Sequence, residues 1–281
     1  MNILKQGTGA VLLAVVVVFS VYASDSAKEQ RWANQIVEFL IDGEPRWLEA
    51  GEQKFLGIYT PARGPYTKGA VILLHGGGAH PDWPQVIQPL RTQLPDTGWA
   101  TLALQMPVLH SGASNAAYVP LFKEVPARIE AGLTFLSQQG VSNVILLGHS
   151  LGSNMASDYL ARNRDPRVKG FVGIGMVGNP QPDEHQVLDN VAALLRMKVP
   201  VLDVYGSQTV PEILQSVDRR AFAVYQTGND HSRQIEISGA NHFFQGYEAE
   251  LLQSVASWIT MLVNPQQASK FERTDNVSQL K

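Results

Sequence analysis

An apolar, β-branched run that ends in a glycine-flanked serine constrains the fold of this chain more than any other feature. Residues 144–152 read VILLGHSLG, and helical spacing continues over Leu151–Arg162. A strand that turns sharply into a helix places Ser150 at the tip of the turn. Gly148 and Gly152 allow this turn to close without Cβ clashes. Because a serine hydroxyl is a weak nucleophile unless a base and oxyanion donors reach it, this placement predicts nucleophilic catalysis at Ser150.

Apolar strands and helical stretches alternate along most of the chain. The predicted strands are Ala70–Leu74, Ala100–Leu104, Asn143–Leu147, Gly170–Ile174, Pro200–Tyr205 and Gln234–Ile237. The predicted helices lie near Pro84–Gln93, Val119–Gln139, Leu151–Arg162, His185–Met197, Pro211–Gln226 and Gly246–Leu262. A helix over Ser26–Leu40 and two extended segments, Arg46–Glu49 and Lys54–Tyr59, precede them. This order predicts an α/β fold with a mostly parallel central sheet and helices on both faces.

The length of the chain, 281 residues, fits one α/β domain, which we expect over residues 24–263. Residues 1–23 have the pattern of a secretory signal peptide: Lys5, an apolar run, and small residues that predict cleavage after Ala23. The alternative is a retained membrane anchor, but the apolar run is shorter than the ~20 residues of a spanning helix. We expect export to the periplasm or medium, a small cap at most, over residues 178–198, and a flexible polar tail over 264–281.

Charge and cysteine content exclude several classes of function. The net charge is −3, and it becomes −4 without the predicted signal peptide, in which Lys5 is the sole charged residue. The sequence contains no cluster of Lys and Arg interleaved with aromatic residues, so we expect no nucleic-acid binding. The chain has no cysteine, which excludes disulfides and thiolate metal sites. Neither glycine motif has the spacing of a nucleotide-binding fingerprint, which argues against a phosphate-binding loop. Nucleophilic catalysis by a serine needs no metal or organic cofactor, and we expect none.

A glycine loop directly follows the first predicted strand of the parallel series. His75-Gly76-Gly77-Gly78 has the form of the HGGG-type loop that supplies an oxyanion donor in lipases and esterases. We expect the amide of Gly77 or Gly78 to act together with the amide of Leu151.

One of the seven histidines is the candidate base. His242 lies in the segment GANHFF between the last predicted strand and the last helix. The chain order of serine, acid and histidine in such folds places the base there. His75 and His149 belong to the glycine motifs, where we expect them to orient the backbone.

The motifs LLHGGG, GHSLG and GANHFF, in this order, resemble those of the alpha/beta-hydrolase superfamily. The resemblance covers nearly all of the mature chain and is nearest to a branch of exported bacterial alpha/beta-hydrolase-like proteins with no settled substrate. It implies an alpha/beta-hydrolase fold and a serine hydrolase that acts without a cofactor.

The catalytic acid departs from the pattern of that superfamily. Relatives usually carry an aspartate in a Gly-x-x-Asp arrangement after the strand equivalent to VPVLDVYG, whereas this chain has Thr209 there. Threonine cannot carry the charge that stabilises an imidazolium. The substitutes are Glu212, three residues further on, and Asp183 or its neighbour Glu184, after the preceding strand. Asp203, inside its strand, is a weaker candidate, and a site without an acid is the remaining possibility.

These observations lead to one main hypothesis and two alternatives. The main hypothesis is an exported esterase that acts on a small-molecule ester, with Ser150 as nucleophile and His242 as general base. Met176 and Phe243, near strand ends, are candidates for an apolar substrate pocket. Because Thr209 replaces the expected acid, a binding or scaffolding protein on a hydrolase fold is an alternative. Acyl transfer to another acceptor is a second alternative, since an acyl-enzyme can react with an alcohol or amine as well as with water.

Overall fold

The computed structural model describes residues 23–177, 190–263 and 269–270, and in this part of the chain eight strands form one sheet. The order of the strands is β1-β2-β5-β4-β6-β7-β8-β9. Strands β1 and β2 are antiparallel, β2 is antiparallel to β5, and the remaining neighbours are parallel. The strands are β1 (Glu44–Ala50), β2 (Gln53–Thr60), β4 (Gly69–Leu74), β5 (Trp99–Leu104), β6 (Val144–His149), β7 (Val168–Ile174), β8 (Val201–Gly206) and β9 (Arg233–Ile237).

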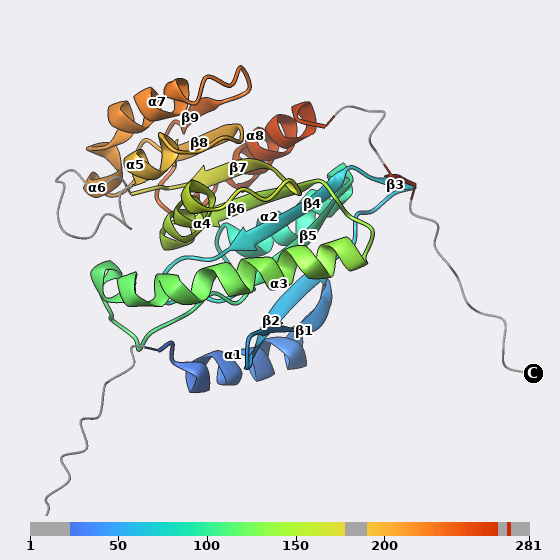
Figure 1. Ribbon diagram of the computed structural model, residues 1–281. Helices are drawn as coiled ribbons and strands as arrows, with labels where there is room; N and C mark the ends of the chain where they lie inside the picture. Colours follow the sequence, from blue (N-terminus) through green and yellow to red (C-terminus); the bar gives the residue numbers. More distant parts are fainter. Residues whose placement is uncertain (1–22, 178–189, 264–268, 271–281) are drawn as a thin grey trace, which may run out of the picture.

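Helices cover both faces of this sheet (Figure 1). One face packs against α3 (Val125–Gln138), α4 (Leu151–Arg162), α5 (Asn190–Leu194) and α7 (Val217–Gln226). The opposite face packs against α1 (Ser26–Phe39), α2 (Ile87–Gln93) and α8 (Glu248–Met261). The predicted mostly parallel sheet with helices on both faces is therefore confirmed. No helix in the described ranges is long and apolar enough to cross a membrane.

The central strands are apolar along their whole length because they are buried on both faces. Every residue of β4, β5 and β6 is buried. Strand β6 lies between β4 and β7, so the carboxyl ends of these three parallel strands meet at one edge of the sheet. Ligands bind at this edge in open α/β sheets, and the loops after β4 and β6 carry the two glycine motifs.

Some boundaries differ from those that the sequence predicts. The helix expected over Pro211–Gln226 is two helices, α6 (Pro211–Leu214) and α7. Between them, the hydroxyl of Ser216 donates to the carbonyl of Ile213 (2.9 Å), a local bond that competes with helical pairing. The helix expected over Val119–Gln139 begins as a 3-10 helix, Asn115–Glu124, which continues into α3.

Residues 1–22 and most of the expected tail lie outside the described residues, as does the larger part of the expected cap. Within residues 264–281, Ser269–Lys270 forms strand β10, which pairs with β3 (Tyr66–Thr67) in a small separate sheet.

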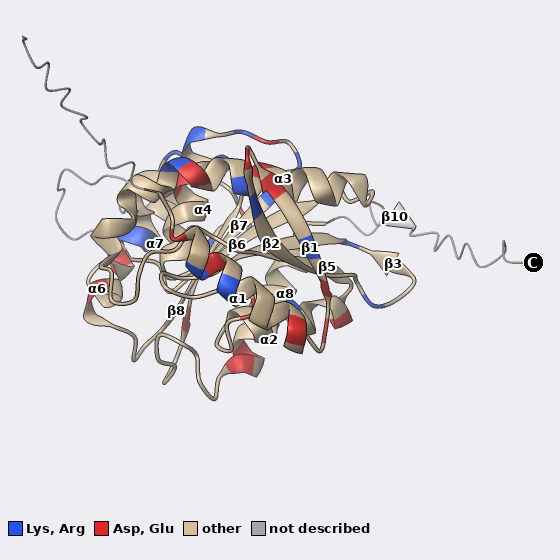
Figure 2. Ribbon diagram, turned by 90° about the horizontal axis from the view of Figure 1, so that it is seen from below, with Lys and Arg blue, Asp and Glu red and all other residues tan. Residues whose placement is uncertain are grey.

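A buried ion pair that the sequence does not reveal fixes α1 to α3. The guanidinium of Arg128 donates to both carboxylate oxygens of Glu29, at 2.9 and 3.2 Å, and both side chains are buried. Elsewhere on this side of the molecule, acidic and basic residues are interspersed along the helices (Figure 2).

Candidate active site

The turn at Ser150 has the strained backbone of a nucleophile elbow. Ser150 has φ 54° and ψ −124°, a conformation that side-chain-bearing residues seldom adopt. The residues two positions before and after Ser150 must be glycine. A Cβ added at Gly148 would lie 2.4 Å from the carbonyl oxygen of Gly152, and a Cβ added at Gly152 would lie 2.2 Å from the carbonyl oxygen of Leu74. The Ser150 amide donates to the carbonyl of Ile174 on β7 (2.9 Å), which fixes the turn to the sheet.

The glycine loop after β4 packs directly on this elbow. A Cβ added at Gly76 would lie 3.2 Å from Cβ of Ser150, and one added at Gly77 would lie 3.2 Å from Cδ2 of Leu151. His75 holds the loop in place. Its Nδ1 donates to the carbonyl of Gly76 (2.8 Å), while its Nε2 accepts from the Met106 amide (2.9 Å). Burial lowers the pKa of His75 to about 3, which keeps the ring neutral and suited to one donated and one accepted bond.

The two candidate amides of the glycine loop differ in their partners. The amide of Gly78 donates to the hydroxyl of Tyr118 (2.9 Å), which also accepts from the amide of Leu109 (3.2 Å). Within the described residues, the amides of Gly77 and Leu151 donate to no protein group. The amides of Gly77 and Leu151 are therefore free to donate to an oxyanion. The hydrogen bond by which Tyr118 holds Gly78 in place was not predicted from the sequence.

His242 lies on a loop that is fixed at both sides. The side chain of Asn241 accepts from the amide of Phe243 (2.9 Å), and the buried ring of Phe244 anchors the loop in the core, although Phe244 itself has φ 54°. The ring of His242 lies against Gly175, just after β7, where an added Cβ would be 3.0 Å from Cε1. The imidazole thus reaches the same edge of the sheet as Ser150.

His149, the neighbour of Ser150, supports this loop. Its Nε2 donates to the carbonyl of His242 (3.1 Å), and the centroids of the two rings are 4.9 Å apart. Burial, together with the nearby His242, lowers the pKa of His149 to about 3, so the ring is a neutral donor. His75 and His149 both orient backbone groups, as the glycine motifs predicted.

Thr209 occupies the place beside His242 that an acid would have. The loop after β8 is hydrogen-bonded to the histidine loop, since the amide of Gln208 donates to the carbonyl of Ala240 (2.9 Å). This pairing brings the hydroxyl of Thr209 to 3.3 Å from Nδ1 of His242. Burial lowers the pKa of His242, and in the described part of the chain no carboxylate acts against this shift.

Two of the candidate acids, Glu212 and Asp203, lie in the described part of the chain, and neither is paired with His242 there. Glu212 is exposed in the first turn of α6, and among the described residues no hydrogen bond or ion pair joins it to the imidazole. Asp203 is fully buried in β8, where Oδ2 accepts from Arg220 Nε (2.9 Å) and from the side-chain amide of Gln234 (2.7 Å). Its role is therefore in the core. Asp183 and Glu184 lie outside the described residues.

The two candidate pocket residues have different surroundings. Met176 is fully buried, and its side chain covers the position where Gly173 would carry a Cβ. Phe243 is 40% exposed, and its ring centroid lies 5.1 Å from that of His242. Of these two residues, Phe243 is therefore the one that lies beside His242.

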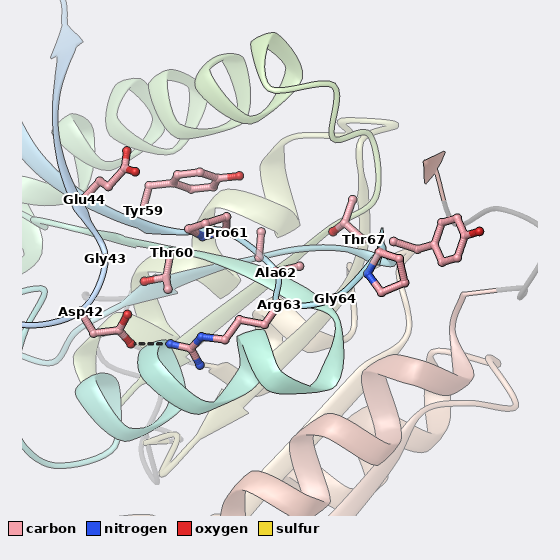
Figure 3. A pocket seen from close by; sticks show the side chains of 13 residues that line it. Asp42, Gly43, Glu44, Tyr59, Thr60, Pro61, Ala62, Arg63, Gly64 and Thr67 are labelled. Carbon is pink, nitrogen blue, oxygen red and sulfur yellow. Dashed lines mark hydrogen bonds and ion pairs between the residues drawn. The ribbon is translucent and has the colours of Figure 1, made fainter. Parts of the chain in front are cut away.

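One large cavity is lined by neither Ser150 nor His242. It measures about 900 Å³ and lies beside Thr60, Thr67 and Ala100, at the amino ends of β4 and β5 (Figure 3). Ser150 follows the carboxyl end of β6, which is parallel to β4, so the cavity and the serine lie at opposite edges of the sheet. The charged group of Arg63 in the cavity is already paired with Asp42 (2.8 Å).

A family model described as "Protein of unknown function (DUF3530)" matches residues 22–120 and 113–261, which is most of the chain. The chain belongs to the DUF3530 family. A comparison with curated proteins gives no match.

Solved structures similar to this DUF3530 chain are alpha/beta hydrolases. A dienelactone hydrolase from Anabaena variabilis is 21% identical, with a TM-score of 0.62, over 79% of this chain and 99% of that chain. Est1E from Butyrivibrio proteoclasticus is 14% identical, with a TM-score of 0.59, over 79% and 99% of the chains. XC6422 from Xanthomonas campestris, an α/β serine hydrolase without a lid, is 12% identical, with a TM-score of 0.58, over 80% and 97%. At these identities the likeness shows the fold: this family member has the alpha/beta-hydrolase fold.

Proposed function

We propose that this chain is an exported serine hydrolase that cleaves carboxylic esters through an acyl-enzyme on Ser150. The observation that carries the proposal is the strained elbow of Ser150 between two unpaired amides, those of Gly77 and Leu151. Strained backbone persists where the surrounding structure enforces it, and such positions cluster at active sites. Two adjacent free amides are the donors that a tetrahedral oxyanion requires.

The reaction follows from the groups around Ser150. Its Oγ attacks the acyl carbon while Nε2 of His242 accepts the proton, and the amides of Gly77 and Leu151 bind the oxyanion. The imidazolium then protonates the leaving alkoxide. In the second half, His242 takes a proton from water, which attacks the acyl carbon. The imidazolium then returns a proton to Oγ of Ser150 as the acid product leaves.

The proposed mechanism uses one tautomer of His242. In it, Nδ1–H donates to the hydroxyl of Thr209, which lies 3.3 Å away, and Nε2 carries the lone pair that accepts the proton. A hydroxyl orients the ring but gives no charge to stabilise the imidazolium, so we expect slow turnover in comparison with sites that contain an acid. Ser150 and His242 share no hydrogen bond in the described structure, and such bonds often tighten only with substrate bound.

Two further lines of support concern substrate and location. The similar structures include a dienelactone hydrolase and Est1E, the latter also with ferulic acid bound. From these structures we carry over to this chain only the proposed class of substrate, a small-molecule carboxylic ester. Export is proposed from the sequence of residues 1–23.

The test is covalent trapping of the serine. Chain 24–281 would be treated with a fluorophosphonate probe and the adduct located by mass spectrometry, with Ser150→Ala and His242→Ala as variants and Ser111→Ala, an exposed serine, as control. We expect labelling at Ser150 in the wild type and the control, and loss of labelling in both active-site variants. An unreactive Ser150 in a protein that melts cooperatively would refute the proposal.

A binding protein on a hydrolase fold is the second candidate, because Thr209 takes the place of the acid. This function predicts that Ser150→Ala keeps the cellular role of the protein. A phenotype lost in that variant would exclude it.

A further inference from the structure

The first described residues of the chain are held by specific polar contacts. The backbone nitrogen of Ser24 donates to Oε1 of Glu124 (3.1 Å), and the Ser24 hydroxyl accepts from Nη2 of Arg128 (3.3 Å). The next amide, that of Asp25, donates to the carbonyl of Val108 (2.7 Å). The fold therefore fixes the chain from Ser24 onward, whereas Ala23 is exposed.

The charges around Ser24 leave one carboxylate without a full partner. Arg128 gives both Nη atoms to Glu29 and lies at the longer distance of 3.5 Å from Oε2 of Glu124. Asp25 caps α1 by accepting from the Lys28 amide (2.9 Å), and the ammonium of Lys28 donates to a backbone carbonyl. Among the described residues, Glu29 and Glu124 therefore share one cation, the guanidinium of Arg128. A further positive charge at Ser24 would balance the cluster.

We propose that the fold contains a receptor for the amino terminus that cleavage between Ala23 and Ser24 creates, and that this receptor is the carboxylate of Glu124. A peptidase adds water across the Ala23–Ser24 peptide bond; Ala23 leaves as a carboxylate, and the nitrogen of Ser24 becomes an ammonium. That nitrogen is the atom that already donates to Oε1 of Glu124. The site of cleavage rests on the proposed export, but the pairing itself depends only on a chain that begins at Ser24.

Cleavage strengthens this contact without moving it. In the uncut chain, an amide N–H meets a carboxylate, and in the cut chain, an ammonium does so. A backbone N–H that donates to a carboxylate is already a charge-assisted hydrogen bond. The ammonium adds the Coulomb attraction between two opposite charges, and this attraction is stronger because Glu124 is largely shielded from water. The mature chain is therefore more stable than a chain whose amino group is blocked.

A double-mutant cycle on chain 24–281 tests the pairing. The chain would be made with a free or an acetylated Ser24 amino group, each with Glu124 intact or as Glu124→Gln, and the four melting temperatures compared. In the wild type we expect acetylation to lower Tm by about 2–4 °C, the shift that a typical interaction gives in a domain of this size. In Glu124→Gln we expect acetylation to change Tm by less than half as much. Glu38→Gln, an exposed glutamate on α1, should behave like the wild type.

The outcomes separate this inference from the proposed function. Equal shifts on acetylation in the wild type and in Glu124→Gln would overturn the pairing, whatever the result of the probe labelling. If Glu124→Gln does not fold, Glu124→Asp serves instead: the pairing predicts a reduced acetylation effect because the shorter carboxylate withdraws from Ser24, and an unchanged effect would overturn it. The intact mass of the exported protein tests the cleavage separately, with Ser24 expected as the first residue.

Discussion

The hydroxyl of Thr209 lies 3.3 Å from Nδ1 of His242, and the loop that carries it is hydrogen-bonded to the histidine loop. This arrangement retains the geometry of an acid beside a base, but it lacks the charge. The hydroxyl can hold the ring in position, whereas the imidazolium of the proposed mechanism would have no anion next to it among the described residues. In the proposed mechanism, the basicity of His242 therefore depends on residue 209, which a single substitution can change.

Replacing Thr209 by aspartate should increase turnover. The new carboxylate would accept from Nδ1–H and stabilise the imidazolium, and the loss of this anion in a serine protease lowers turnover by ~10⁴. We expect a gain of about tenfold or more in kcat with a p-nitrophenyl ester, and a loss with Thr209→Val, which cannot accept the bond. Glu212→Gln is the matched control and should leave kcat unchanged, because Glu212 is exposed.

The results would contradict this role of Thr209 if the aspartate and valine variants both kept the wild-type rate. In that case Asp183→Asn, in the segment outside the described residues, becomes the decisive variant. A large fall in kcat there would assign the acid to Asp183.

The dependence of activity on pH should reflect the buried histidine. Burial lowers the pKa of His242 from its usual value of about 6.5. Since only the neutral ring accepts a proton, kcat/KM should fall as the pH falls through this lowered pKa, and stay level from about pH 6.5 to pH 8. In Thr209→Asp the carboxylate favours the charged ring, so the acid limb should move to higher pH. A shift to lower pH would be inconsistent with this electrostatic argument.

The elbow at Ser150 and the loop position of His242 could be predicted from the sequence. The glycines around Ser150 are required by backbone contacts of 2.2 to 2.4 Å, and such a requirement leaves a fixed spacing in the sequence. The position of His242 follows from the order of strands and helices. The choice between Gly77 and Gly78 could not be predicted, since both are glycine and only the partner of Gly78 distinguishes them.

The long-range polar contacts had no signal in the sequence. The hydroxyl of Tyr118 accepts from the amide of Gly78, which is 40 residues away in the sequence, and Arg128 donates to Glu29, which is 99 residues away. A tyrosine or an arginine in an apolar segment is compatible with many partners, and only the packed tertiary structure selects one. The same reason explains why Asp203 could be considered as an acid before its burial with Arg220 was known.

Removing the charge of Asp203 should destabilise the protein without removing the reactivity of Ser150. Asp203→Asn would leave the guanidinium of Arg220, which is fully buried, without its counter-charge, at a cost of about 3–5 kcal/mol in the free energy of unfolding. Urea denaturation measures this loss. Asp158→Asn, which breaks the more exposed pair with Arg162, should change the free energy by at most ~0.5 kcal/mol. Unchanged stability together with lost labelling would instead make Asp203 the acid.

Tyr118→Phe should lower turnover through the glycine loop. The hydroxyl of Tyr118 accepts from the amides of Gly78 (2.9 Å) and Leu109 (3.2 Å), so its removal frees the loop that carries the Gly77 amide. Because small displacements of an oxyanion donor are costly, we expect kcat to fall about ten- to a hundredfold, with a smaller change in KM. Tyr225→Phe, at an exposed position, is the control and should match the wild type in steady-state kinetics. If Tyr118→Phe raised KM and left kcat unchanged, the tyrosine would contact the substrate rather than position the oxyanion loop.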